Sequence, residues 1–231
     1  MMPRTPEPEL MNQAEQVQAY ADADFEKPHG QFIKLLEKRI GPTRTRGRAL
    51  DLGCGPGDIT YRFAEARPGW SIQAVDGASA MIDCAKRDPR ALRMSGRIHF
   101  LCARLPDWEP TDPTFDLVIS NSLLHHLADP FHLWNAIRDF TSPNAEIFIM
   151  DLKRPSSQNS VNSLVERYAG DEPAVLKRDF EASLHAAYRT DEVSEQFERV
   201  GLDHLTIEEI SDRHWIVHGP VSAQGSSRDR P

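Results

Sequence analysis

The sequence predicts an α/β fold: a doubly wound, mostly parallel seven-stranded sheet that ends in an antiparallel hairpin, with a helical N-terminal cap and a helical insertion after the fifth strand. Two observations support this fold class. Short apolar runs of strand length alternate with amphipathic stretches of helical spacing, as in doubly wound domains. Some runs are apolar at consecutive positions, such as Leu117-Val118-Ile119 and Ile147–Met150. That pattern is typical of parallel strands buried on both faces.

The expected elements follow in order along the chain. Strands are expected at 48–52, 71–75, 98–102, 115–120 and 146–151, with helices between them at 58–67, 78–88 and 130–140. Two further helical stretches, 14–40 and 156–188, lie outside this alternation, and the second follows a Pro-Ser-Ser start signal. A last helix at 191–200 precedes two strand-like runs at 205–210 and 214–218, which form the hairpin.

Composition limits the class of protein. The 231 residues suffice for one domain, and 27 basic against 35 acidic residues give a net charge of −8, which weighs against nucleic-acid binding. No apolar run approaches the ~20 residues of a membrane span, and the first ten residues lack the apolar region of a signal peptide. Three scattered cysteines argue against a disulfide framework or a structural zinc site. We therefore expect a cytoplasmic protein.

A glycine-rich turn follows the first expected strand. Ala49-Leu50-Asp51-Leu52 ends that strand, Gly53-Cys54-Gly55-Pro56-Gly57 forms the turn, and a helix begins near Asp58. Open α/β sheets bind ligands at the carboxyl ends of their strands. Glycines let the backbone come close to a ligand, and the N-terminus of a helix directs free N–H groups at it. The turn is therefore a candidate cofactor site.

The spacing of the glycines discriminates between cofactors. A dinucleotide fingerprint, G-x-G-x-x-G, would need glycine where the chain has Asp58. The glycines stand instead at the alternate positions 53, 55 and 57. Asp76 ends the second strand, about 20 positions on, where nucleotide-binding folds hold ribose hydroxyls. The spacing therefore counts against NAD.

Three segments in order resemble the class I methyltransferases that use S-adenosylmethionine. They are Asp51-Leu52-Gly53-Cys54-Gly55-Pro56-Gly57, Ala74-Val75-Asp76-Gly77-Ala78-Ser79-Ala80-Met81, and Phe115-Asp116-Leu117-Val118-Ile119-Ser120-Asn121-Ser122-Leu123-Leu124-His125-His126-Leu127. The resemblance implies one methyltransferase domain over residues 1–231. Within it we expect an N-terminal helical cap (14–40), a cofactor-binding core (48–151), a helical lid (156–188), a final helix and hairpin (190–219) and a flexible tail (220–231).

The resemblance also implies roles for single residues in binding S-adenosylmethionine or its product, S-adenosylhomocysteine. The three glycines would cradle the amino-acid part of the cofactor, and Asp76 would hold the ribose hydroxyls. Met81 would pack on the adenine, and Asn121 would lie near the ribose or the methionine portion. The family often has an acidic residue directly after the third strand, but Leu101-Cys102-Ala103-Arg104-Leu105-Pro106 has none, so backbone groups at Cys102 and Ala103 would bind the adenine. The full predicted cofactor set is Asp51, Gly53, Cys54, Gly55, Gly57, Asp76, Gly77, Met81, Cys102, Ala103 and Asn121.

His125 and His126 are the candidate catalytic residues, because they follow the fourth strand where the methyl group should sit. An imidazole titrates near neutral pH, so either could take a proton from the acceptor. Consecutive side chains are expected to point apart, with His125 favoured to face the cavity and the other to face the protein body. Both could instead be structural. We expect no metal, because Ser120-Asn121 and Asp151 do not supply the carboxylate set of a magnesium enzyme.

The resemblance implies transfer of a methyl group to a small or medium organic molecule by in-line displacement. A nucleic-acid or protein methyltransferase and a non-catalytic cofactor-binding protein remain open alternatives. The sequence leaves the acceptor, the methylated atom and the oligomeric state open.

Overall fold

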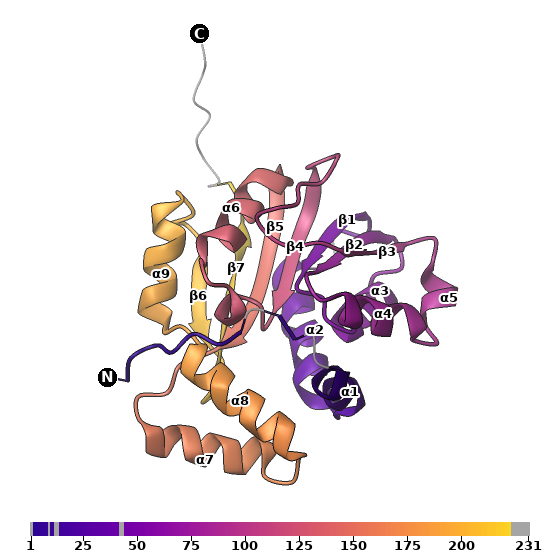
Figure 1. The fold of residues 1–231 in the computed structure, drawn as a ribbon. Coiled ribbons are helices and arrows are strands. Elements are labelled where there is room, and N and C mark those ends of the chain that lie inside the picture. Colours follow the sequence, from indigo (N-terminus) through magenta and orange to yellow (C-terminus); the bar gives the residue numbers. More distant parts are fainter. Residues whose placement is uncertain (1, 9, 12–13, 42–43, 223–231) are drawn as a thin grey trace.

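The computed structural model confirms the expected architecture (Figure 1). It describes residues 2–8, 10–11, 14–41 and 44–222. Seven strands form one sheet in the order β3-β2-β1-β4-β5-β7-β6. The first five pair in parallel, and β7 pairs antiparallel with both β5 and β6. The strands are β1 Gly47–Leu52, β2 Trp70–Asp76, β3 Ile98–Cys102, β4 Phe115–Asn121, β5 Thr141–Leu152, β6 Thr206–Glu209 and β7 His214–Pro220.

Helices cover the sheet and one of its edges (Figure 1). Among the described residues, none is both long and apolar enough to span a membrane. They are α1 Ala14–Asp22, α2 Glu26–Ile40, α3 Asp58–Ala66, α4 Ser79–Arg87, α5 Ala91–Met94, the 3-10 helix η1 Leu124–His126, α6 Phe131–Phe140, α7 Gln158–Ala169, α8 Ala174–Ala186 and α9 Thr190–Arg199.

Two apolar cores lie on opposite faces of the sheet, which explains the consecutive apolar residues in its strands. Val118 packs in the core that includes residues of α6 and α9, whereas its neighbour Ile119 packs in the core with α2 and α3. In β5, Ile147 and Phe148 divide between the two cores in the same way. Successive side chains of a strand point to opposite faces, so a strand covered on both sides needs apolar residues at every position.

The helical stretches outside the alternation are each interrupted once. The N-terminal stretch divides into α1 and α2, and the Asp24 carboxylate accepts a hydrogen bond from the backbone N–H of Glu26 at 2.9 Å. The second stretch divides into α7 and α8, and Pro173 directly precedes α8. Proline lacks the N–H that an uninterrupted helix would need there. Of the predicted flexible tail, residues 223–231 lie outside the described part of the chain.

Asp58 connects three segments at the start of α3. Its carboxylate accepts hydrogen bonds from His29 Nδ1 at 2.8 Å, Arg62 Nε at 2.6 Å and Arg90 Nη2 at 3.0 Å. Burial alone would raise the pKa of Asp58, but these donors together lower it well below its ordinary value. The carboxylate therefore holds α2, α3 and the loop before α5 together.

Replacing Asp58 with asparagine is expected to lower the free energy of unfolding by about 2 kcal/mol, the scale of hydrogen bonds to a charged group. A depressed carboxyl pKa stabilises the fold above the unfolded value of 3.8, and that stability is lost as pH falls through the folded pKa. Urea unfolding of parent and Asp58→Asn should therefore differ at neutral pH and converge in acid. Asp83→Asn, on the exposed side of α4, is the control. Equal stability of the Asp58 variant and the parent at neutral pH would refute this role.

Candidate active site

A cavity of about 660 Å³ opens at the carboxyl edge of the sheet, where Leu52 at the end of β1 and Asn121 at the end of β4 line it. Its volume is within the range of small-molecule sites. The loops after β1, β2 and β4 form one side, and the two N-terminal helices and α8 form the other. The turn with the glycines and both histidines therefore face one cavity.

The three positions in the turn require glycine for different structural reasons. All have positive φ angles, +73° at Gly53, +53° at Gly55 and +85° at Gly57. A Cβ at the first would lie 2.9 Å from Leu123, and one at the third 3.0 Å from Phe100. A Cβ at Gly55 would meet nothing within 4 Å, and this residue lines the cavity. Gly55 therefore leaves space on the ligand side, whereas the other two glycines allow close packing.

Asp76 lies at the end of β2 and holds the turn in place. One carboxylate oxygen accepts from the backbone N–H of Gly55 at 2.9 Å, and the other accepts from Ala78 at 2.8 Å. Burial raises the pKa of this carboxyl, while the two backbone donors oppose the rise. Gly77, Met81 and Ala103 also line the cavity beside it. This part of the predicted cofactor set is brought together.

Four residues of that predicted set do not line the cavity: Asp51, Cys54, Gly57 and Cys102. Asp51 is buried in β1, where its carboxylate accepts from Thr60 Oγ1 at 2.5 Å, and burial raises its pKa to about 7. Cys54 is buried, and burial raises the pKa of its thiol. Cys102 is exposed. The side chain of Asp51 therefore joins β1 to α3 through Thr60, and neither Asp51 nor Cys54 lies on the cavity wall.

Asn121 ends β4 and has an amide oxygen directed at no protein donor. Its Oδ1 is buried without a hydrogen-bond partner among the described residues, and the side chain lines the cavity. The next residue, Ser122, has a φ of +58°, an uncommon conformation outside glycine that often marks functional sites. An unpaired acceptor beside the open space at Gly55 fits a ligand with N–H or O–H donors, such as the ammonium and ribose groups of S-adenosylmethionine.

His125 and Asp151 form a buried pair below the cavity. Nδ1 of the histidine donates to Oδ1 of Asp151, which also accepts from Leu152 N at 2.6 Å, while Oδ2 accepts from Leu124 N at 2.7 Å. Burial disfavours the imidazolium, but the charge and hydrogen bond of Asp151 raise the pKa of His125. The same contact lowers the pKa of Asp151 against the effect of its own burial. The pair can therefore accept a proton at Nε2 while Asp151 fixes the ring.

His126 differs from the expectation that the two rings point apart. The rings of His125 and His126 lie 4.3 Å apart at an angle of 35°, and both residues line the cavity. The 3-10 turn of η1 brings the two rings to the same side. Burial and the neighbouring imidazole lower the pKa of His126 to about 3, so this ring is neutral and weakly basic. Of the two, His125 is the better proton acceptor.

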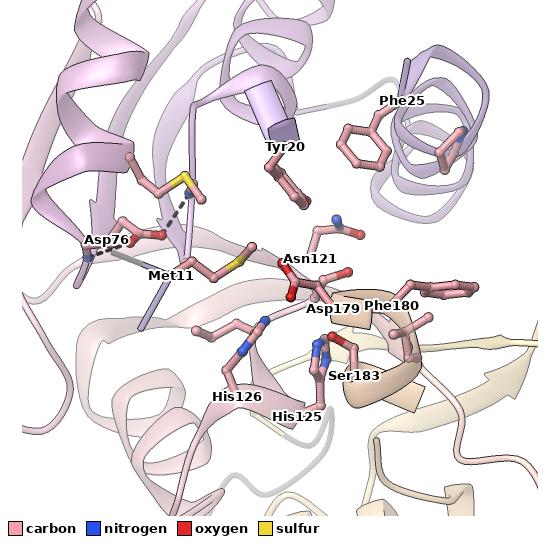
Figure 2. Close-up of a pocket in the computed structure, with 18 of the residues that line it drawn as sticks. Met11, Tyr20, Phe25, Asp76, Asn121, His125, His126, Asp179, Phe180 and Ser183 are labelled. Atoms are coloured by element: carbon pink, nitrogen blue, oxygen red, sulfur yellow. Dashed lines mark hydrogen bonds between the residues drawn. The ribbon is translucent and has the colours of Figure 1, made fainter. Parts of the chain in front are cut away.

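The far side of the cavity comes from segments that no local motif marks. Figure 2 shows Tyr20 and Phe25 from the N-terminal helical cap and Asp179, Phe180 and Ser183 from α8 around the same space. Gln16 Nε2 donates to Asp179 Oδ2 at 2.8 Å and so joins α1 to α8. Ser183 Oγ donates to Glu7 Oε2 at 3.2 Å, which brings the N-terminal segment to the histidines.

Sequence comparisons match this core to methyltransferases. The family model of the methyltransferase domain matches residues 49–144. Trans-aconitate 2-methyltransferase of Mycobacterium tuberculosis is 32% identical over 152 residues, which are 64% of this chain and 52% of that protein. The enzyme of the same name from Streptomyces avermitilis is 34% identical over 93 residues, 40% of this chain and 34% of the relative. The chain thus spans about half or less of the length of these relatives.

Solved structures share the fold at low sequence identity. The plantazolicin methyltransferase BpumL, in complex with a substrate analogue and SAH, has a TM-score of 0.68 and 14% identity, covering 88% of this chain and 89% of that one. A SAM-dependent methyltransferase from Aquifex aeolicus has a TM-score of 0.64 and 16% identity, covering 90% and 98%. Several neighbours hold S-adenosylmethionine or S-adenosylhomocysteine.

The glycine turn and the strands β2, β3 and β4 lie in the part of the chain that the family model matches, residues 49–144. Asp76, Asn121 and the open space at Gly55 suit S-adenosylmethionine, which is the cofactor these features imply. Over residues 49–144 the chain is therefore similar to S-adenosylmethionine-dependent methyltransferases, and it shares their fold.

Proposed function

We propose that this chain transfers the methyl group of S-adenosylmethionine to a small or medium organic molecule, with His125 as general base. The observation that carries the proposal is the His125–Asp151 pair in the same cavity as Gly55 and Asp76. Such a pair is arranged to remove a proton from a positioned acceptor.

The cofactor, when bound, supplies a methyl group made electrophilic by its sulfonium. The chain contributes position and exclusion of water. Gly55 leaves space for the cofactor, Asp76 and Asn121 offer acceptor oxygens, and Met81 is an apolar neighbour. Holding two reactants in line about 3 Å apart in a closed site removes much of the entropic barrier.

The acceptor's proton would move to Nε2 of His125. Nδ1–H of His125 donates a hydrogen bond to Asp151, so the lone pair of the neutral ring is at Nε2. The nearest carboxylate oxygen, Oε1 of Glu7, lies 3.5 Å from this nitrogen, beyond the range of a good hydrogen bond. The lone pair therefore stays available for an acceptor O–H or N–H.

Two observations support a small molecule as the acceptor: the helices that lie over the cavity and the names of the relatives. α1 and α8 meet over it through Gln16 and Asp179, an arrangement that suits a small molecule better than a polymer. The trans-aconitate 2-methyltransferases act, by name, on a small organic acid. A small-molecule acceptor for this chain agrees with both observations.

Calorimetry should show that S-adenosylhomocysteine binds the parent and that NAD does not. Gly55→Ala should abolish or strongly weaken this binding, because the new methyl group would point into open space on the ligand side. Gly201→Ala is the matched control: its φ of +79° imposes similar backbone strain and its Cβ also meets nothing within 4 Å, but it lies outside the cavity lining. Equal binding by Gly55→Ala and the control would place the cofactor elsewhere.

With an acceptor found by screening organic acids, alcohols and amines for S-adenosylhomocysteine release, His125→Ala should lower turnover by ~10²–10⁴, as loss of a general base does. Affinity for S-adenosylhomocysteine should change little. His132→Ala on α6, outside the cavity lining, should behave as the parent. A loss of turnover confined to His126→Ala would assign the base to the other ring. If neither cavity histidine slows the reaction more than a few-fold, positioning alone accounts for catalysis.

A further inference from the structure

Three metal-binding atoms from two distant parts of the sequence converge beside the cavity. Glu7 Oε1, His125 Nε2 and His126 Nδ1 all lie within 4.8 Å of one another. The carboxylate oxygen is 3.5 Å from the first nitrogen and 3.4 Å from the second. The side chains are 9%, 2% and 15% exposed, respectively. The cluster is therefore shielded from water on most sides.

The three atoms present lone pairs to one another. Nδ1–H of His125 donates a hydrogen bond to Asp151, so Nε2 of the neutral ring carries a lone pair. Glu7 Oε1 and His126 Nδ1 are buried and have no hydrogen-bond partner within the described residues. Their separation exceeds the ~2.7–3.2 Å of an N–H···O bond, and each buried polar atom without a partner costs about 1–3 kcal/mol. A cation at the centre would satisfy all three atoms at once.

The spacing suits a metal ion better than a hydrogen bond. Imidazole nitrogens and carboxylate oxygens bind zinc at about 2.0–2.2 Å, so two ligands at a tetrahedral angle stand roughly 3.4 Å apart. The carboxylate oxygen of Glu7 lies 3.5 Å and 3.4 Å from the two imidazole nitrogens. Small side-chain rotations would bring all three ligands to bonding distance.

Two of the three ligands are already oriented by a further partner. Asp151 holds Nδ1 of His125, and Ser183 Oγ donates to Oε2 of Glu7 at 3.2 Å, which leaves Oε1 for the cluster. Metal-binding histidines commonly donate their other N–H to a carboxylate in this way. The N-terminal segment is fixed independently, because Arg4 Nη2 donates to the carbonyl of His125 at 2.9 Å.

We propose that Glu7, His125 and His126 together bind one divalent first-row transition-metal ion, such as zinc. Two imidazoles among three ligands favour this class over magnesium or calcium, which prefer oxygen. The ion would bind Nε2 of His125, the same nitrogen that accepts the proton in the proposed reaction. Metal binding and general-base catalysis by His125 therefore exclude each other. This site differs from the expectation of no metal, which rested on the missing carboxylate set of a magnesium enzyme at Ser120-Asn121 and Asp151. No spacing rule links Glu7 to the two histidines.

Cobalt(II) titration of the metal-free full chain tests the site without cofactor or acceptor. One equivalent of cobalt should give the visible absorption of a tetrahedral complex, and one equivalent of zinc should abolish it. Asp151→Asn should weaken binding by about 10–100-fold, as loss of such an orienting carboxylate does. Glu7→Gln should weaken it further while the chain stays folded, because this residue belongs to neither apolar core of the sheet.

Two control variants separate this site from general surface binding. Glu172→Gln removes another carboxylate that lines the cavity, and His132→Gln removes a histidine on α6; both should keep the cobalt spectrum. Absence of the tetrahedral spectrum in the parent, or equal binding by Glu7→Gln and the controls, would overturn the proposal. The cobalt spectrum is independent of methyl transfer. Failure of the proposed methyl transfer would therefore leave the metal site standing, and absence of the metal site would leave the proposed methyl transfer standing.

Discussion

The central position of β1 determines where this protein can act. β1 is hydrogen-bonded to β2 on one side and to β4 on the other, and Leu52 is level with Val75 and Ser120. The strand order reverses between β1 and β4, so the loops that follow these two strands run to opposite faces of the sheet. A crevice opens between the loops at this point of a doubly wound sheet. The carbonyl of Val75 accepts the N–H groups of Gly53 and Cys54 at 2.8 and 3.1 Å. The glycine turn is thereby held against the end of β2, with Asn121 opposite.

The side of the cavity that carries the glycine turn could be predicted because its residues are close in sequence to the strand ends that position them. Gly55, Asp76 and Asn121 each follow or end an apolar run that can be recognised without the structure. The same motifs contain residues that serve the fold, such as Asp51 under the turn and Gly57 against Phe100. Ligand contact and tight packing require the same residue types there, so a pattern cannot separate them.

The side of the cavity with the two histidines depends on contacts between residues far apart in the sequence. Asp151 reaches His125 because β5 lies beside β4, and a carboxylate at a strand end is not specific enough to predict the pair. Glu7 reaches the same ring because Arg4 donates to backbone carbonyls of α8 and η1 and Ser183 donates to Glu7 itself. The close approach of the two histidine rings follows from the 3-10 turn of η1, which hydrophobic periodicity does not indicate.

The division of the cavity between two kinds of segment has a consequence for how this fold can diversify. The residues matched by the methyltransferase family model, 49–144, include the glycine turn, whereas Tyr20, Asp179 and Ser183 on the far side of the cavity lie outside that range. The segments that carry these three residues add no strand to the sheet. Exchange of α1 or of α8 between homologous chains would therefore replace the far side of the cavity while the strand register stays the same. Recombination at the two borders of the core can thus reshape the cavity without changes within the core.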